Sequence, residues 1–209
     1  MSEDARRIEA AFGGLDLIHS LYDRFPCGLR FALGGKAQAV SDPLPFLQAV
    51  DRARAILRAL WPKPSTAALL IYMREDERDA RAMHSETVAS LASCGLDPRM
   101  FRHIGATPKT LHAADGAPYD SWLHIHFCEA PVDCDMADRA LWGAIAAETP
   151  IRPKLEGCAH PVFVDFGARI AAHVYDDRWM DVVAMEADSL RVLHRRYADW
   201  IFEDHVKLA

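Results

Sequence analysis

The sequence predicts an α+β protein in which helices pack on a mixed, mainly antiparallel sheet of about five or six strands. Several segments place apolar residues three and four apart, which is typical of amphipathic helices. Residues 67–73 form an unbroken apolar run, and three further β runs lie between residues 161 and 185. The links between these last runs are too short for parallel crossovers, so we expect them to pair antiparallel.

The first elements follow from an apolar stripe and from a helix-start signal. Residues 3–24 are predicted to form a helix that Gly13-Gly14 can kink or split, because each Gly costs about 1 kcal/mol relative to Ala in a helix. Residues 28–33 form the first predicted strand. Asp42-Pro43 is a typical helix start, and the apolar stripe of this helix ends before Pro62.

In the middle of the chain a buried strand is followed by a helix and a hairpin. Residues 67–73 are expected to lie centrally in the sheet with both faces covered, because the run is apolar throughout. Ser85 caps a short helix that ends at Gly95. Prolines interrupt the stretch 97–121, in which Asp115-Gly116 is a hairpin signal leading into a strand over residues 122–129.

Towards the C-terminus, a helix capped by Asp133 or Asp135 precedes a three-stranded meander. The first two strands of the meander lie within 161–174, with a break at Gly167, and the third covers 180–185. An amphipathic helix starts at Asp188 or Ser189 and closes the segment 161–204; its apolar stripe is Leu190, Leu193, Tyr197 and Trp200.

Composition and charge restrict the class of protein. A chain of 209 residues, 51% hydrophobic and 26% charged, fits a single domain over residues 1–209. The net charge of −6 disfavours nucleic acid as a partner, because phosphate neutralisation requires clustered Lys and Arg. No apolar run approaches the roughly 18 residues of a membrane span. Five scattered cysteines without a Cys-x-x-Cys pair favour a reducing compartment, so we expect a cytoplasmic protein.

The turn inside the meander carries the most specific motif, Tyr-Asp-Asp-Arg-Trp-Met-Asp over residues 175–181, and the last helix carries Asp199-Trp200. This pattern resembles an uncharacterised bacterial family of unknown function, whose C-terminal signature reads Tyr-Asp-Asp-Arg-Gly-Met-Asp and whose last helix carries Asp-Trp. Residues 29–35 look like the Arg-Phe-Glu-Leu-Gly element of that family. The resemblance implies a shared fold and no established activity. Trp179 replaces the Gly of the signature, which would strain a turn that needs positive φ there.

The turn has two interpretations. In the structural one, Asp176 caps the turn, Arg178 pairs with a carboxylate of its own hairpin or with Asp199, and Tyr175 packs under a buried Trp200. In the functional one, Arg178 and an exposed Trp179 project from the hairpin to bind a partner, since Arg and Trp are favoured interface residues. The candidate binding residues are Tyr175, Asp176, Asp177, Arg178, Trp179, Asp181 and Arg30.

The strand over 122–129 suggests a metal site. Its alternation places His124, His126 and Cys128 on one face. Zinc needs three or four ligands, so a further donor must come from elsewhere, the candidates being His160, His173, Asp176 and Asp177. The metal ligands that we predict are His124, His126, Cys128 and His173. The alternative is that this polar face is solvated or packs under a helix with its histidines hydrogen-bonded.

No phosphate-binding loop and no Gly-x-Ser-x-Gly nucleophile motif is present in the sequence. We therefore expect a small acidic binding or regulatory module without a cofactor, which binds and neutralises another protein. The alternative is an enzyme that uses a divalent metal such as zinc, held by the His124/His126 strand and the Asp176/Asp177 turn. The sequence indicates no oligomeric state.

Overall fold

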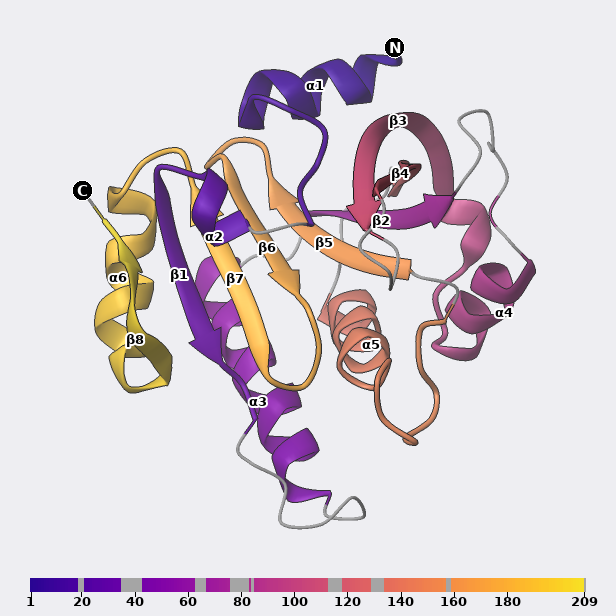
Figure 1. Cartoon of the computed structure of the whole chain (residues 1–209). Helices are drawn as coiled ribbons and strands as arrows, with labels where there is room; N and C mark the ends of the chain where they lie inside the picture. Colours follow the sequence, from indigo (N-terminus) through magenta and orange to yellow (C-terminus); the bar gives the residue numbers. More distant parts are fainter. Residues whose placement is uncertain are drawn as a thin grey trace.

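The computed structural model describes residues 1–18, 21–34, 43–62, 67–75, 83, 85–112, 118–128, 134–156 and 159–208. Its strands form a single twisted sheet in the order β3-β4-β2-β5-β6-β7-β1-β8 (Figure 1). The strands are β1 (Cys27–Ala32), β2 (Ala68–Glu75), β3 (Phe101–His112), β4 (Pro118–Cys128), β5 (Ala159–Asp165), β6 (Ile170–Val174), β7 (Trp179–Ala184) and β8 (Ile201–Lys207). The helices are α1 (Glu3–Phe12), α2 (Leu21–Arg24), α3 (Leu44–Leu60), α4 (Ser85–Ser93), α5 (Cys134–Ile145) and α6 (Asp188–Arg196).

The α+β class is confirmed, but the predicted sheet is too small. Within the described residues the sheet has eight strands, and each of its strand pairs is antiparallel, so it is not mixed. Two strands were missed. β3 lies in the proline-containing stretch, where Pro108 is tolerated because β3 is an edge strand. β8 includes residues 201–204, which were predicted to be the end of the last helix, whereas α6 ends at Arg196.

The meander is confirmed, and it extends into strands from the N-terminal half. β5, β6 and β7 pair in sequence order, as predicted. β1 then lies between β7 and β8, while β2 lies between β4 and β5. The pairing of β1 with β7 places Arg30 opposite Asp181. The motif over residues 29–35 and the motif over residues 175–181 therefore lie side by side.

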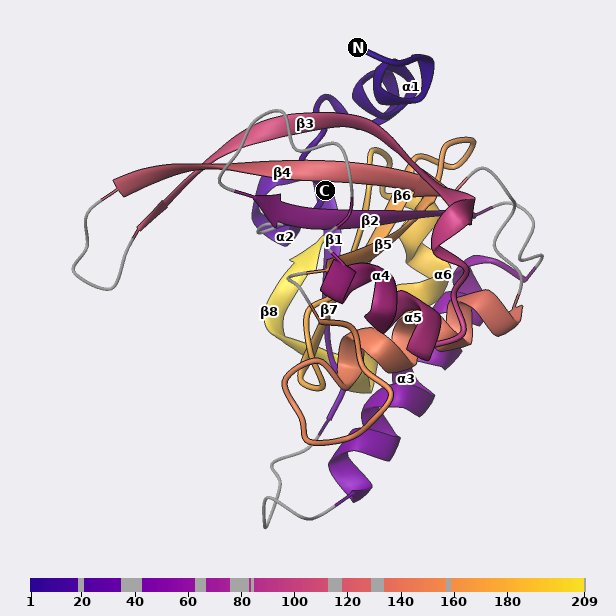
Figure 2. The ribbon, with the colours of Figure 1, turned by 90° about the vertical axis from the view of Figure 1, so that its right-hand side faces the viewer.

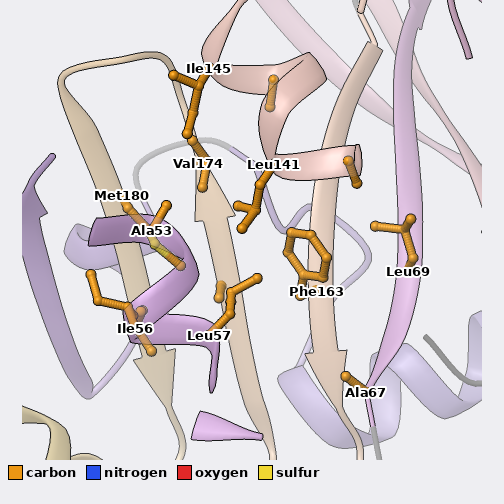
Figure 3. Close-up of a cluster of buried hydrophobic side chains, with 14 of the residues drawn as sticks. Ala53, Ile56, Leu57, Ala67, Leu69, Leu141, Ile145, Phe163, Val174 and Met180 are labelled. Carbon is orange, nitrogen blue, oxygen red and sulfur yellow. The ribbon is translucent and has the colours of Figure 1, made fainter. Parts of the chain in front are cut away.

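One face of the sheet packs against α3, α5 and α6. Ala53, Ile56 and Leu57 of α3 and Leu141 of α5 point at the sheet residues in Figure 3. The sheet side of this core comes from alternate residues of several strands: Leu29, Phe31, Leu69, Ile71, Phe163, Val174, Met180 and Val182. The helical stripe of α3 is therefore buried against this face together with α5 and α6, which agrees with its apolar periodicity.

The opposite face packs against α1, α2 and the segment between them; Figure 2 shows α1 on the other side of the sheet from α3 and α5. Ile8, Phe12 and Leu21 contact this face. β2 is covered on both faces, as its apolar sequence predicts, because Leu70 and Tyr72 point to this core while Leu69 and Ile71 point to the other.

Several helix boundaries differ from the prediction. The expected helix over 3–24 is split: α1 ends at Phe12, where Gly13 adopts φ 75° and its N–H closes the last turn on the carbonyl of Glu9. Gly95, at φ 75°, ends α4 as predicted. The predicted signals at Asp42, Asp115-Gly116 and Asp133 lie outside the described residues. None of the described helices is both long and apolar enough to cross a membrane.

Candidate functional site

A buried ion pair joins the two motifs on the α2 face of the sheet. Arg30 Nε donates to Asp181 Oδ1 at 2.7 Å, and Arg30 Nη2 donates to Oδ2 at 3.0 Å. Asp181 is fully buried, whereas the side chain of Arg30 is 23% exposed. The hydrogen bonds to Asp181 raise the pKa of Arg30 above its usual value, so the guanidinium keeps its charge at any ordinary pH.

Two further groups donate to the same carboxylate. The Tyr175 hydroxyl lies 2.8 Å from Asp181 Oδ2, and the backbone N–H of Tyr22 in α2 lies 3.1 Å from it. Burial, followed by the negative charge of Asp181, raises the pKa of Tyr175, so its hydroxyl stays protonated and acts as a donor. Asp181 therefore fixes α2 and the end of β6 to the β1–β7 pair.

The turn itself is organised around Asp176, whose side chain is almost completely buried. Asp176 Oδ1 accepts hydrogen bonds from the backbone N–H groups of Arg178, at 2.7 Å, and Trp179, at 3.2 Å. Its Oδ2 accepts from Arg178 Nε at 2.9 Å and also from Arg178 Nη2. These bonds raise the pKa of Arg178. The predicted ion pair between Arg178 and a carboxylate of its own hairpin is confirmed.

Other parts of the predicted clasp are wrong. Trp200 is only partly buried and stacks on Tyr197, with ring centroids 4.6 Å apart, in a 3₁₀ turn after α6. Tyr175 packs instead against His173, at 4.3 Å between centroids. Trp179 is partly buried against Phe202 of β8. Its backbone is unstrained, because among the described residues Arg169 is the one non-glycine residue with positive φ.

Asp177 and Gly34 lie where the turn meets the end of β1. The backbone N–H of Leu33 donates to the carbonyl of Arg178 at 2.8 Å. A Cβ atom on Gly34 would lie 2.5 Å from the carbonyl oxygen of Asp177, so only glycine fits this contact. Burial and the neighbouring Asp176 carboxylate raise the pKa of Asp177. The contact with Gly34 is made by the backbone of Asp177, which therefore contributes to the packing of the turn.

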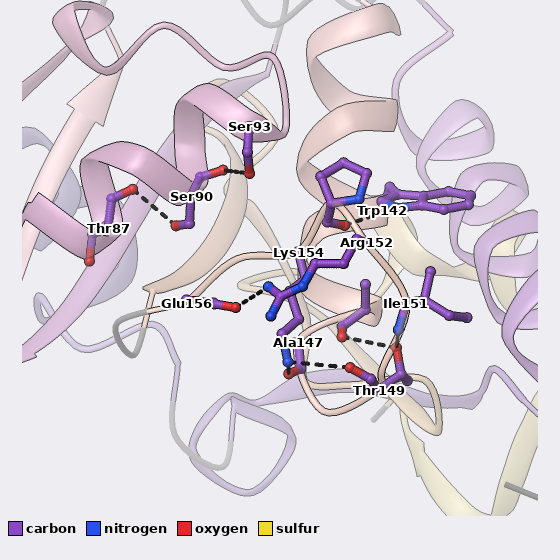
Figure 4. A network of polar contacts seen from close by, with 12 residues as sticks. Thr87, Ser90, Ser93, Trp142, Ala147, Thr149, Ile151, Arg152, Lys154 and Glu156 are labelled. Carbon is purple, nitrogen blue, oxygen red and sulfur yellow. Dashed lines mark hydrogen bonds and ion pairs between the residues drawn. The ribbon is translucent and has the colours of Figure 1, made fainter.

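The loop after α5 brings a second carboxylate to the turn. Trp142 Nε1 donates to the carbonyl of Pro153 at 3.0 Å, and Lys154 Nζ donates to the carbonyl of Ala147 at 3.2 Å (Figure 4). These bonds hold the loop against α5. Glu148, in the same loop, lies 3.4 Å from Arg178 Nη2, and both side chains are largely exposed.

A pocket of about 440 Å³ opens above the buried ion pair. We call it the signature pocket; its lining residues are Arg30, Tyr175, Asp176, Trp179, Phe202 and His205. Trp179 meets Phe202 in an edge-to-face contact at 4.9 Å, and Phe202 lies 4.9 Å from His205. The ring of His205 lies 5.1 Å from that of Tyr22. The pocket therefore combines aromatic walls with the guanidinium of Arg30, which Asp181 holds at the base of the pocket.

The structure unites four of the predicted binding residues in the lining of this pocket and places Asp181 directly beneath it. Arg178 holds Asp176 from outside the pocket, and Asp177 lies in the turn. Sequence reasoning missed Phe202 and His205, because residues 201–204 were assigned to a helix. The signal that could have identified a strand is the pair of β-branched residues Ile201 and Val206, which bracket this segment.

The histidines of β4 lie elsewhere, on the face covered by α3 and α5. His124, His126 and Cys128 are buried and share this face, as predicted. His103 of β3, which was not a candidate, lies opposite His126, and its Nε2 is 3.1 Å from His124 Nδ1. Burial, and then the neighbouring His103 and His124, lower the pKa of His126 to about 4. His126 Nε2 has no hydrogen-bond partner among the described residues.

The predicted metal ligand set is wrong. His173 pairs in register with Val162, whose side chain lies in the core of the α1 face, so His173 and the β4 histidines point to opposite faces of the sheet. Asp176 is engaged by Arg178 in the distant turn. In the part of the chain that the structure describes, no group of three or more His, Cys, Asp or Glu side chains is placed to hold a metal ion.

Comparison with known proteins shows one family over nearly the whole chain. Residues 5–205 match the family described as "Domain of unknown function (DUF3885)". The chain is also 23% identical over 206 residues to the "Uncharacterized protein YnaE" of Bacillus subtilis (strain 168), covering 94% of this chain and 95% of that protein. No solved structure matches. Because the family match covers both motifs and the sheet that joins them, the chain belongs to the DUF3885 family.

Proposed function

We propose that this protein is a cytoplasmic binding module that engages another protein through the signature pocket and thereby regulates or neutralises it. The observation that carries the proposal is the lining of the pocket. Trp, Tyr and Arg are the residues most enriched among those that dominate binding energy at protein interfaces, and here Trp179, Tyr175 and Arg30 line one pocket.

Hydrogen bonds also hold the lining residues of the pocket in place. Arg30 and Tyr175 are both fixed by Asp181, and Asp176 is fixed by Arg178 and by two backbone N–H groups. A site held in its bound geometry loses little conformational entropy on binding. Phe202, at 45% exposed, and Val206, at 40%, extend the apolar surface from the pocket along β8.

Site-specific photocrosslinking tests the proposal. p-Benzoylphenylalanine replaces Phe202 in one chain and Val192 in another, and both chains are irradiated in their native host. Val192 is the matched control, since it is 65% exposed but lies on α6, outside the pocket lining. We expect a discrete crosslinked protein from position 202 and none from position 192. The proposal fails if the two positions give the same pattern, or if position 202 crosslinks to no protein.

A further inference from the structure

We infer that the signature pocket binds the C-terminal residue of its protein partner, with the terminal carboxylate on Arg30 and the side chain on Trp179 and Phe202. The inference rests on the proposed function, since it names the part of the partner that enters the pocket. It is argued from the hydrogen-bond donors of Arg30, from the charges around it and from the shape of the ligand.

Arg30 keeps hydrogen-bond donors for a ligand. A guanidinium has five N–H groups, and the side-on edge formed by Nε and Nη2 is used by Asp181. Within the described chain, Arg30 makes no hydrogen bond other than these two. Because its side chain is partly exposed and lines the pocket, the end-on edge remains for a planar anion, which a carboxylate fits in a bidentate manner.

The carboxylates near Arg30 are offset by hydrogen-bond donors or by a neighbouring cation, which allows an anion at its remaining edge. Asp23, which acts on Arg30 electrostatically, lies beside Lys207, whose Nζ donates to the backbone carbonyl of Asp23 at 3.1 Å. Asp181 spreads its charge over donors from Arg30, Tyr175 and Tyr22. The ammonium of Lys207 lies 4.8 Å from the centre of the Tyr22 ring, and the Arg30 guanidinium lies 5.3 Å from the same centre. The one carboxylate in the pocket lining, Asp176, already accepts four hydrogen bonds from Arg178 and Trp179, so its charge is offset.

The apolar side chains next to Arg30 favour the carboxylate of a C-terminal residue over that of an internal Asp or Glu. Trp179 and Phe202 form an edge-to-face pair that can receive an apolar side chain. In a C-terminal residue the carboxylate and the side chain branch from one carbon, so both can enter a pocket of about 440 Å³. An internal Asp or Glu has a carboxylate without a separate apolar side chain, and therefore leaves this wall uncovered.

NMR titrations with three probes test the inference on the purified full chain, following the Arg30 Nε–H and Trp179 indole N–H signals. The probes are N-acetylphenylalanine, its C-terminal amide, and N-acetylglutamate with both main-chain ends blocked. We expect the free acid to bind at least about tenfold more tightly than the amide, because a charged hydrogen bond contributes roughly 1.5 kcal/mol or more. Equal binding of the acid and the amide, or of the blocked glutamate and the acid, overturns the inference.

Two sets of variants complete the test. Phe202→Ala should weaken binding of the acid several-fold while Val192→Ala leaves it unchanged. Arg30→Gln combined with Asp181→Asn removes both charges and leaves two amide groups that can hydrogen-bond to each other. With its fold verified by the dispersion of its NMR spectrum, this variant should bind acid and amide equally, and a retained preference for the acid contradicts the inference. The probe titrations and the photocrosslinking can fail independently. If the pocket does not discriminate between acid and amide, position 202 can still crosslink to a protein. If the pocket binds the acid, the crosslinking can still show no protein partner.

Discussion

Arg30 and Arg178 each pair with a buried carboxylate, but they contribute differently to the stability of the fold. Arg30 compensates the charge of Asp181, which is fully buried. Arg178 compensates Asp176 from a side chain that is 61% exposed, and Asp176 keeps two backbone donors without it. Sequence reasoning placed the main structural role on Arg178, because the contact between Arg30 and Asp181 spans 151 residues and cannot be inferred from local spacing.

Arg30→Ala should therefore destabilise the protein far more than Arg178→Ala. Removing Arg30 leaves the buried Asp181 carboxylate without a counter-ion and should lower the free energy of unfolding by about 3–5 kcal/mol. Removing Arg178 should cost about 1 kcal/mol, since its side chain is 61% exposed and Asp176 keeps its two backbone donors. Urea denaturation of both variants measures the difference. Equal losses, or a larger loss for Arg178→Ala, would show that the ion pair under the pocket is not the main support of the site.

His126 should make the stability of the protein depend on pH. Its pKa is about 4 in the folded state, against 6.5 for an ordinary histidine, so the unfolded chain binds the proton more tightly. The stability that the neutral His126 contributes is therefore fully present above pH 6.5 and is lost as the pH falls towards 4. The loss attributable to His126 should reach roughly 3 kcal/mol over this window.

Denaturant melts of the wild type and His126→Leu across pH 4–7 isolate this contribution, because the other titrating groups are shared by both proteins. The wild type should lose more stability than the variant on acidification. Parallel pH profiles would mean that His126 is hydrated in the folded protein.

Among the helices and strands, the sequence predicts those whose apolar residues are continuous or regularly spaced and those that end at a helix-terminating residue. β2 and the meander were predicted because their apolar runs are continuous or alternate, and α4 because Gly95 ends it. β8 was not predicted, because the helix that starts at Asp188 was expected to continue to residue 204, whereas Ile201–Lys207 form a strand by pairing with β1. Phe202 and His205 therefore reach the signature pocket through a strand pairing for which the β-branched residues Ile201 and Val206 are the only local signal.

The turn at the end of β1 tests how tightly the signature hairpin is held. Gly34→Ala places a Cβ atom 2.5 Å from the carbonyl oxygen of Asp177, which is backbone and cannot rotate away. We expect a loss of about 1–3 kcal/mol in the free energy of unfolding. Gly14→Ala is the matched control: no heavy atom lies within 4 Å of its added Cβ, and the change should be neutral or slightly stabilising. Thermal melts that show the same Tm shift for both variants would contradict the packing of Gly34 against the turn.

For the whole molecule, the antiparallel sheet is what creates the candidate site. β1 inserts between β7 and β8, so residues from both ends of the chain surround the signature pocket. The same topology explains why the metal interpretation failed, since the β4 histidines and His173 face opposite sides of the sheet. Four of the six lining residues were already candidates from the sequence, whereas the pocket that they form could be found only with the strand order.

The most direct test of this account asks whether the signature pocket anchors a protein partner. A chain with p-benzoylphenylalanine at position 206, on β8 next to the pocket lining, is irradiated with Trp179 intact, with Trp179→Ala and with the control Val192→Ala. If Trp179 is an interface anchor worth about 2 kcal/mol or more, Trp179→Ala should reduce the crosslinked product by at least about tenfold at subsaturating partner. Val192→Ala should leave the yield unchanged. Equal yields from all three chains would show that binding at β8 does not use the pocket and would contradict the proposed function.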